Sequence, residues 1–257
     1  MTLSQRRHTA AGKLSRAEAA QRIRSADTRD RDHGTHMERL LDHDLDRIKQ
    51  LLLRMGGMVE SMVAMATRAL LERSLELCEK VIGNDTDVDR LEIEIDEDCH
   101  SILGRKQPTA VDLRFLVAVM KINSDLERIG DSAVNIAQSV EQLTDQPPLK
   151  PYIDLPHMSQ LVQTMVRQSL DAFVRKDGAL ALAVCKSDDA VDGLYKQIFR
   201  ELLTYMIEDP KSVSRALHLL LIARNLERIA DHATNIAEDV IYYAEGRDVR
   251  HSLGKLQ

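Results

Sequence analysis

The chain has no tryptophan, few other aromatic residues and few prolines. Aromatic side chains make up 3% of its 257 residues, and there are 6 prolines. Alanine, leucine, glutamate, arginine and isoleucine are abundant instead. This composition is typical of long helices that pack through aliphatic side chains, so we expect an all-α fold.

Long hydrophobic runs are also missing. No apolar stretch approaches the roughly 18 residues that span a bilayer, and the N-terminus lacks an apolar signal core, so we expect a soluble cytoplasmic protein. The 3 cysteines have no metal-ligand spacing, which indicates reduced packing residues. No glycine-rich phosphate loop is present, so we expect no bound nucleotide.

Positive charge is scarce outside the N-terminus. Residues 1–36 carry a balance of +4, whereas residues 37–257 carry −10. An acidic body argues against a nucleic-acid partner and favours cations or a basic protein partner. Residues 1–36 hold too few apolar side chains to form a core, which predicts a disordered basic tail or an extension left by cloning.

Apolar residues recur at helical spacing from Leu40 onward, interrupted by glycine and proline. Six long antiparallel helices are expected, as two tandem three-helix bundles. The expected domains are residues 37–144 for the first bundle, 145–156 for a proline-rich linker, 157–246 for the second bundle and 247–257 for a tail.

An internal repeat supports two similar halves. The segment LERIGDSAVNIA at 126–137 recurs as LERIADHATNIA at 226–237, with nine of twelve positions identical. In each copy a Glu is followed by an Asp four residues later and by an Asn four residues after that. This spacing puts the three side chains within about 80° of one another on a helix. These oxygen-bearing residues are Glu127, Asp131 and Asn135 in the first copy and Glu227, Asp231 and Asn235 in the second.

A second acidic pair precedes the first in each copy, within the frame D-x-x-V-D-x-L. The pairs are Asp85 with Asp89 and Asp188 with Asp192. If consecutive helices pack in register, four carboxylates converge in each half, and their repulsion is relieved by a cation. Carboxylate and amide oxygens are hard ligands, so a metal site on each bundle is the physical inference.

Other interpretations of the acidic residues stay open. Glu127, Asp131 and Asn135 lie about 120° or more from the apolar centre of their helix, as a simple solvated face would. A carboxylate-bridged metal enzyme or storage protein on a helical bundle is a further alternative. Such enzymes usually use Glu-x-x-His ligands, whereas Gly130 and Ala230 stand three residues after the two glutamates, so we do not expect an enzyme.

The repeated motifs carry a resemblance to a known family. DLERIGDSAVNIA after RKQPTAVDLRFLVAVMKINS, and NLERIADHATNIAEDVIYYAEG after MIEDPKSVSRALHLLLIAR, resemble the PhoU family of phosphate-transport accessory regulators. The resemblance covers residues 37–246 and includes the order of the motifs and the duplication. It implies two three-helix bundles and acidic motifs that bind iron or other metals.

The resemblance also implies a role and partners. The role is negative regulation of the phosphate-starvation response, through the ATPase subunit of a phosphate ABC transporter and a phosphate-sensing histidine kinase. A homodimer is expected, with peripheral membrane association only through these partners. The implied metal ligands fall on Asp85, Asp89, Glu127, Asp131, Asp188, Asp192, Glu227 and Asp231. The helical spacing adds Asn135 and Asn235 as secondary candidates. Fe, Mn, Mg, Zn and Ca are not distinguished, and because Asn225 stands in place of Asp125 the two sites need not bind alike.

Overall fold

The computed structural model describes the backbone of residues 16–105, 108–247 and 249, and the side chains of those from residue 41 onward except residue 105. The chain divides into two compact units, residues 1–44 and 45–257. Helix α1 runs over Arg16–Glu72, so residues 16–36 are helical where the sequence predicts disorder. Local helix propensity accounts for this difference, because residues 16–36 are rich in Ala and Arg and contain no Pro. The rest of the predicted tail, residues 1–15, lies outside the described residues.

Five further long helices follow, as the apolar periodicity predicts. They are α2 (Leu75–Arg105), α3 (Ala110–Thr144), α4 (Asp154–Arg175), α5 (Gly178–Glu208) and α6 (Val213–Glu245), with a 3-10 turn, η1, at Pro210–Ser212. The sequence-based expectation of an all-α fold built from six helices is confirmed. Among the described residues, no helix is long and apolar enough to cross a membrane.

Local signals explain where the helices begin and end. Thr109 and Asp112 form a capping box at the start of α3, with Thr109 N–H donating to Asp112 at 2.9 Å. The Asp177 carboxylate accepts from Leu180 N–H at 2.9 Å and caps α5. Helix α6 ends at Gly246, whose φ of 69° is the left-handed conformation that glycine adopts without strain.

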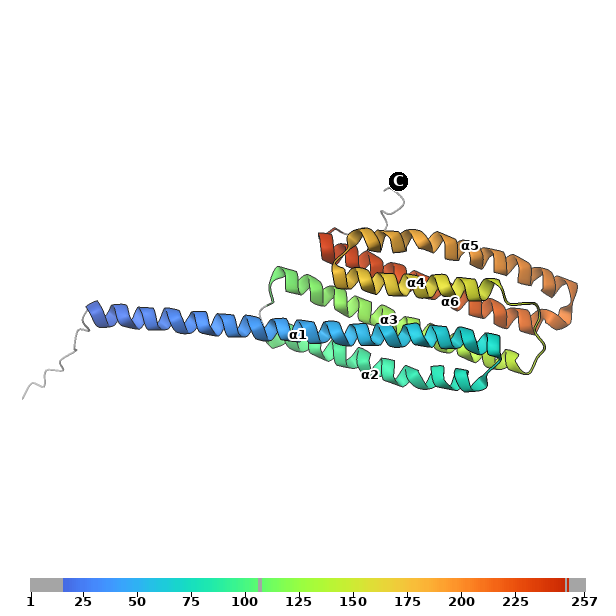
Figure 1. Ribbon diagram of the computed structural model, residues 1–257, viewed down its shortest axis with the longest axis horizontal. Helices are drawn as coiled ribbons and strands as arrows, with labels where there is room; N and C mark the ends of the chain where they lie inside the picture. Colours follow the sequence, from blue (N-terminus) through green and yellow to red (C-terminus); the bar gives the residue numbers. More distant parts are fainter. Residues whose placement is uncertain (1–15, 106–107, 248, 250–257) are drawn as a thin grey trace, which may run out of the picture. The chain divides into compact units, whose positions relative to one another are not determined.

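Within residues 45–257, α3 and α6 lie side by side at the seam between the two halves (Figure 1). Helix α3 also packs on α2, and α6 packs on both α4 and α5. Helix α1 contacts α4 through a hydrogen bond between the Thr67 and Ser159 hydroxyls at 2.6 Å and an ion pair between Glu60 and Arg167 at 2.8 Å. The two halves therefore share one continuous packed interior.

Aliphatic side chains fill this interior, in agreement with the composition. Fully buried examples from different helices are Leu52, Ile95, Leu126, Val162 and Ile229. The linker between the halves is held by cations: the guanidinium of Arg73 donates to the Gln146 carbonyl at 2.7 Å, and Arg215 donates to the Pro147 carbonyl at 3.0 Å. Lys150 is buried and pairs with Asp154 at 3.3 Å.

The predicted C-terminal tail, residues 247–257, is described only at Arg247 and Val249. Val249 is buried at 1% exposure, so the chain still packs against the bundle just after α6. The remaining residues of that tail lie outside the described residues.

Candidate functional site

The first acidic cluster lies between α2 and α3 and comprises Asp85, Asp89, Glu127 and Asp131. Partial burial, together with the charges of Asp89 and Asp131, raises the pKa of Asp85 above its usual value. The pKa of Glu127 is raised by burial and by repulsion from Asp131. These influences show that the carboxylates of α2 and α3 lie within electrostatic range of one another.

Gly130 explains how Asp85 approaches α3 closely. A Cβ at Gly130 would lie 3.8 Å from Asp85 Oδ1 and 3.5 Å from a methyl group of Val88. The position is buried, and a side chain longer than alanine would displace α2. The small residue therefore permits the packing that brings the α2 carboxylates beside α3.

The second acidic cluster lies between α5 and α6 and comprises Asp188, Asp192, Glu227 and Asp231. Burial raises the pKa of Asp188 to about 6, and the charges of Asp231 and Asp192 add to the effect. The pKa of Asp231 is also raised by partial desolvation of its carboxylate, although the residue as a whole is exposed and Arg224 opposes the shift. The same arrangement of acids therefore occurs in both halves.

Glu227 departs from the solvated position that its place on the helix predicts. It is 9% exposed, and its Oε2 is buried without a hydrogen-bond partner among the described residues. Its Oε1 accepts from Arg224 at 2.5 Å. Helix α5 covers this part of α6. The apolar periodicity of α6 alone does not show which of its polar residues a neighbouring helix will cover.

The two clusters differ in their neighbours. Glu92 adds a fifth carboxylate to the first cluster, and burial and the charges of Asp96 and Asp89 raise its pKa. Tyr195 stands at the corresponding place in the second half, displaced by 103 residues like the aspartates, and Arg224 lies 5.9 Å from its ring centre. Sequence reasoning missed Glu92, although its position three residues after Asp89 places it on the same face of α2.

The two asparagines do not join the acidic clusters. Asn135 and Asn235 instead line two separate grooves between α3 and α6. Asn235 donates to Asp125 at 3.3 Å, and His232 Nδ1 lies 2.8 Å from the same carboxylate oxygen. On an ideal helix an acid and an asparagine eight residues later are about 80° apart around the axis, so the two side chains can face different neighbouring helices.

Carboxylates of this kind suit hard metal ions by their chemistry. In their present conformations, however, the described residues include no group of three or more His, Cys, Asp or Glu side chains placed to hold a metal. Exposed Asp131 and Asp231 have room to change rotamer. The clusters therefore provide the donors, and a shared ion would require these side chains to turn inward.

Comparison with known proteins matches both halves of this architecture. The family model described as "PhoU domain" matches residues 52–140 and again residues 155–240. The chain belongs to the PhoU family. Each match contains one complete acidic cluster, so the family domain corresponds to one copy of the internal repeat.

Individual relatives agree with this assignment. The chain is 44% identical over 217 residues to the phosphate-specific transport system accessory protein PhoU homolog of Pseudomonas putida, covering 84% of this chain and 85% of the relative. The homolog from Aquifex aeolicus is 45% identical, covering 81% and 94%. These proteins are named for an accessory role and not for a reaction, in agreement with the expectation that the chain is not an enzyme.

Solved structures show the same fold. The crystal structure of PhoU from Pseudomonas aeruginosa aligns with a TM-score of 0.78 at 43% identity, covering 80% of this chain and 99% of that one. The phosphate transport system regulatory protein PhoU from Streptococcus pneumoniae aligns with a TM-score of 0.75 at 28% identity, covering 81% and 99%.

Proposed function

We propose that this protein is a cytoplasmic regulatory adaptor of phosphate uptake that restrains the phosphate-starvation response. Membership of the PhoU family across both repeats carries the proposal, because relatives with 44–45% identity are named as accessory proteins of phosphate-specific transport. Its partners would be the ATPase subunit of a phosphate ABC transporter and a phosphate-sensing histidine kinase, with the protein acting as a homodimer.

The architecture suits an adaptor. Two bundles that share a continuous interior form a stiff body, and long helices present side chains in fixed rows to a partner. The acidic balance of residues 37–257 favours partners with basic surfaces. A charge of this kind mainly raises the rate and specificity of association, which suits a regulatory contact that forms and dissociates.

Deleting the gene and following a phosphate-starvation reporter tests this proposal. We expect high reporter output in phosphate-rich medium, restored to a low level by the complete chain supplied in trans. Unchanged output after deletion would overturn the regulatory role. Affinity capture from the same cells, compared with a strain that lacks the transporter ATPase, would test the partner directly.

We also propose that each acidic cluster binds a metal ion of the Fe, Mn, Mg, Zn or Ca group. The support is the set of hard oxygen donors, repeated in both halves, and the pKa values that burial and, to a lesser extent, mutual repulsion raise. A bound cation would relieve this repulsion, and Asp85, Asp89, Glu127 and Asp131 would hold it in the first half. In the second half the ligands would be Asp188, Asp192, Glu227 and Asp231.

Elemental analysis of protein purified without a polyhistidine tag tests the metal sites. We expect close to one ion or more per cluster after supplementation with iron or manganese. A content below about 0.2 ion per chain would show that the acids form a solvated face, whatever the outcome of the reporter experiment. The two proposals can therefore fail separately.

A further inference from the structure

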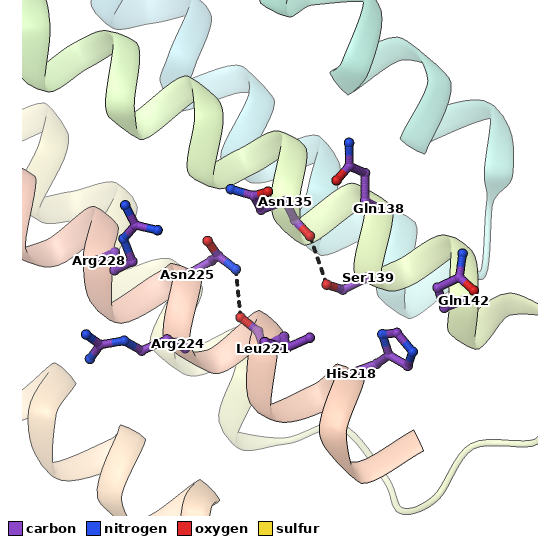
Figure 2. A pocket seen from close by; sticks show the side chains of 9 residues that line it. All are labelled: Asn135, Gln138, Ser139, Gln142, His218, Leu221, Arg224, Asn225 and Arg228. Carbon is purple, nitrogen blue, oxygen red and sulfur yellow. Dashed lines mark hydrogen bonds between the residues drawn. The ribbon is translucent and has the colours of Figure 1, made fainter. Parts of the chain in front are cut away.

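Two grooves lie along the seam between α3 and α6. The larger has a volume of about 500 Å³, and its walls are the side chains drawn in Figure 2, with Asn135 and Gln138 on α3 opposite Arg228 and Asn225 on α6. The smaller groove, of about 300 Å³, lies farther along the same two helices. Both occur at a helix–helix contact, where close packing of apolar side chains is the usual arrangement.

The internal repeat relates the two grooves. Every residue that lines the smaller groove is displaced by 100 residues from one that lines the larger. The pairs are Asn135 with Asn235, Gln138 with Glu238, Ser139 with Asp239, Lys121 with Leu221, Ser124 with Arg224 and Asp125 with Asn225. The grooves are therefore two versions of one feature, generated because α3 and α6 are copies packed against each other.

The two versions have opposite charge. In the smaller groove three acids replace neutral side chains, and two of them contact partners within the protein: Lys121 pairs with Asp239 at 2.6 Å, and His232 lies 2.8 Å from Asp125. In the larger groove the corresponding positions hold amides and a hydroxyl, while α6 contributes two arginines. Lys121 thus supplies a counter-charge within the smaller groove, whereas the lining of the larger groove contains two arginines and no acid.

The arginines lie one helical turn apart on α6. Arg224 donates one of its five N–H groups to Glu227, at 2.5 Å, and Arg228 is exposed along the groove wall. His218, from the same helix, lies farther along the groove, and its Nδ1 is buried without a hydrogen-bond partner among the described residues. The groove therefore combines unused donor capacity with an unpartnered ring nitrogen.

We propose that this larger groove binds a phosphoryl group, either as inorganic phosphate or as a phosphomonoester. Guanidinium groups bind tetrahedral oxyanions through paired charge-assisted hydrogen bonds, and amide N–H groups such as those of Gln138 and Gln142 add neutral donors. The volume is within the range of small-molecule pockets, so a phosphoryl group with a polar body attached also fits. The inference concerns the seam and does not rest on the regulatory role, although Arg224 is shared with the second acidic cluster through its hydrogen bond to Glu227.

Calorimetric titration of the full, chelator-treated protein with inorganic phosphate and with glycerol 3-phosphate tests the proposal. Treatment with chelator removes any phosphate that is held through a metal. We expect saturable binding of at least one probe, and comparison of the two identifies the source of the phosphoryl group. Absence of binding by both at millimolar concentration would overturn the proposal.

Matched variants locate the binding. Arg228→Gln should weaken it about tenfold or more, whereas Arg128→Gln, the exposed repeat equivalent outside the larger groove, should leave it unchanged. Gln138→Glu places the acid of the smaller groove into the larger one, keeps both arginines, and should also weaken binding. Circular dichroism checks that each variant is folded. If all three folded variants bind with the affinity of the unsubstituted protein, the anion binds elsewhere and the assignment is overturned.

Discussion

Two adjacent glycines in α1 have very different surroundings. A Cβ at Gly56 would lie 2.2 Å from Leu170 Cδ1 on α4, whereas a Cβ at Gly57 would meet nothing within 4 Å. Helix α1 continues through both, as expected for a pair that weakens the helix without breaking it. Only Gly56 is needed for the close approach of two helices.

Alanine substitutions separate these two roles. Gly57→Ala should raise the free energy of unfolding by about 0.5–1 kcal/mol, because alanine restricts the unfolded chain and favours helix. Gly56→Ala should be less stable than Gly57→Ala by about 1–3 kcal/mol, since Leu170 must leave its present position. Urea unfolding of both variants measures the difference. Equal stabilities would show that Leu170 moves at little cost.

Asp188 should give the metal-free protein an unusual pH dependence. Its folded pKa of about 6 lies above the unfolded value, so the folded state holds the proton more tightly. The contribution of Asp188 to stability is therefore fully present below about pH 4 and is lost as pH rises through about 6. After allowance for solvent screening, the loss should be about 1–2 kcal/mol.

Urea unfolding between pH 4 and 7.5 checks this expectation. Asp188→Asn should flatten the pH dependence and be more stable at pH 7 without metal. Asp87→Asn serves as a control, because Asp87 is exposed and paired with Arg90 outside the cluster. An unchanged slope in Asp188→Asn would show that this carboxyl titrates normally.

At the scale of the helix, α3 matters most because it contributes to both an acidic cluster and the seam. Its capping box at Thr109 fixes the first turn, and its end at Thr144 leads into the linker held by Arg73. One face presents Glu127 and Asp131 to α2, and the adjacent face presents Asn135 and the groove residues to α6. A shift of α3 would therefore disturb both sites together.

Thr109→Ala should lower the free energy of unfolding by about 0.5–2 kcal/mol, since it removes one half of the capping box. Thr109→Ser keeps the hydroxyl and should retain most of the stability. Thermal unfolding monitored by circular dichroism compares the two. If Ser and Ala are equally destabilising, the threonine methyl group and not the cap is responsible.

For the whole molecule, duplication followed by divergence explains the paired sites. Both halves keep the acid spacing, but Glu92 corresponds to Tyr195, and Ser124 corresponds to Arg224. The first cluster is thus richer in carboxylates, and the second contains an internal cation. The two proposed metal sites should therefore bind with different affinities.

The halves should also bind metal independently. Asp131→Asn should reduce metal in the first half alone, and Asp231→Asn should reduce it in the second, so each single variant retains about half of the metal. Neither substitution opens a core cavity, because both positions are exposed, and the metal-free melting temperature should change little.

The measurement is the metal content and the melting curve of both single variants and of the double variant. Complete loss of metal from either single variant would indicate one shared centre.

The sequence alone determined the helical class, the duplication and the positions of the acidic pairs. These features depend on local spacing: apolar residues every three or four positions specify a helix, and an i, i+4 pair shares a face whatever surrounds it. The expected convergence of Asp85 with Asp131, and of Asp188 with Asp231, followed because consecutive helices in a short-looped bundle are neighbours.

Only the tertiary structure decided which faces become covered. It buries Glu227, adds Glu92 to the first cluster, turns Asn135 and Asn235 to the seam and leaves grooves of opposite charge between α3 and α6. These features depend on contacts between helices that are about 100 residues apart in the chain. The periodicity of one helix identifies its apolar side. The packing of the other helices sets how that helix is rotated about its own axis, and this rotation decides which neighbour each polar residue beside the apolar side contacts.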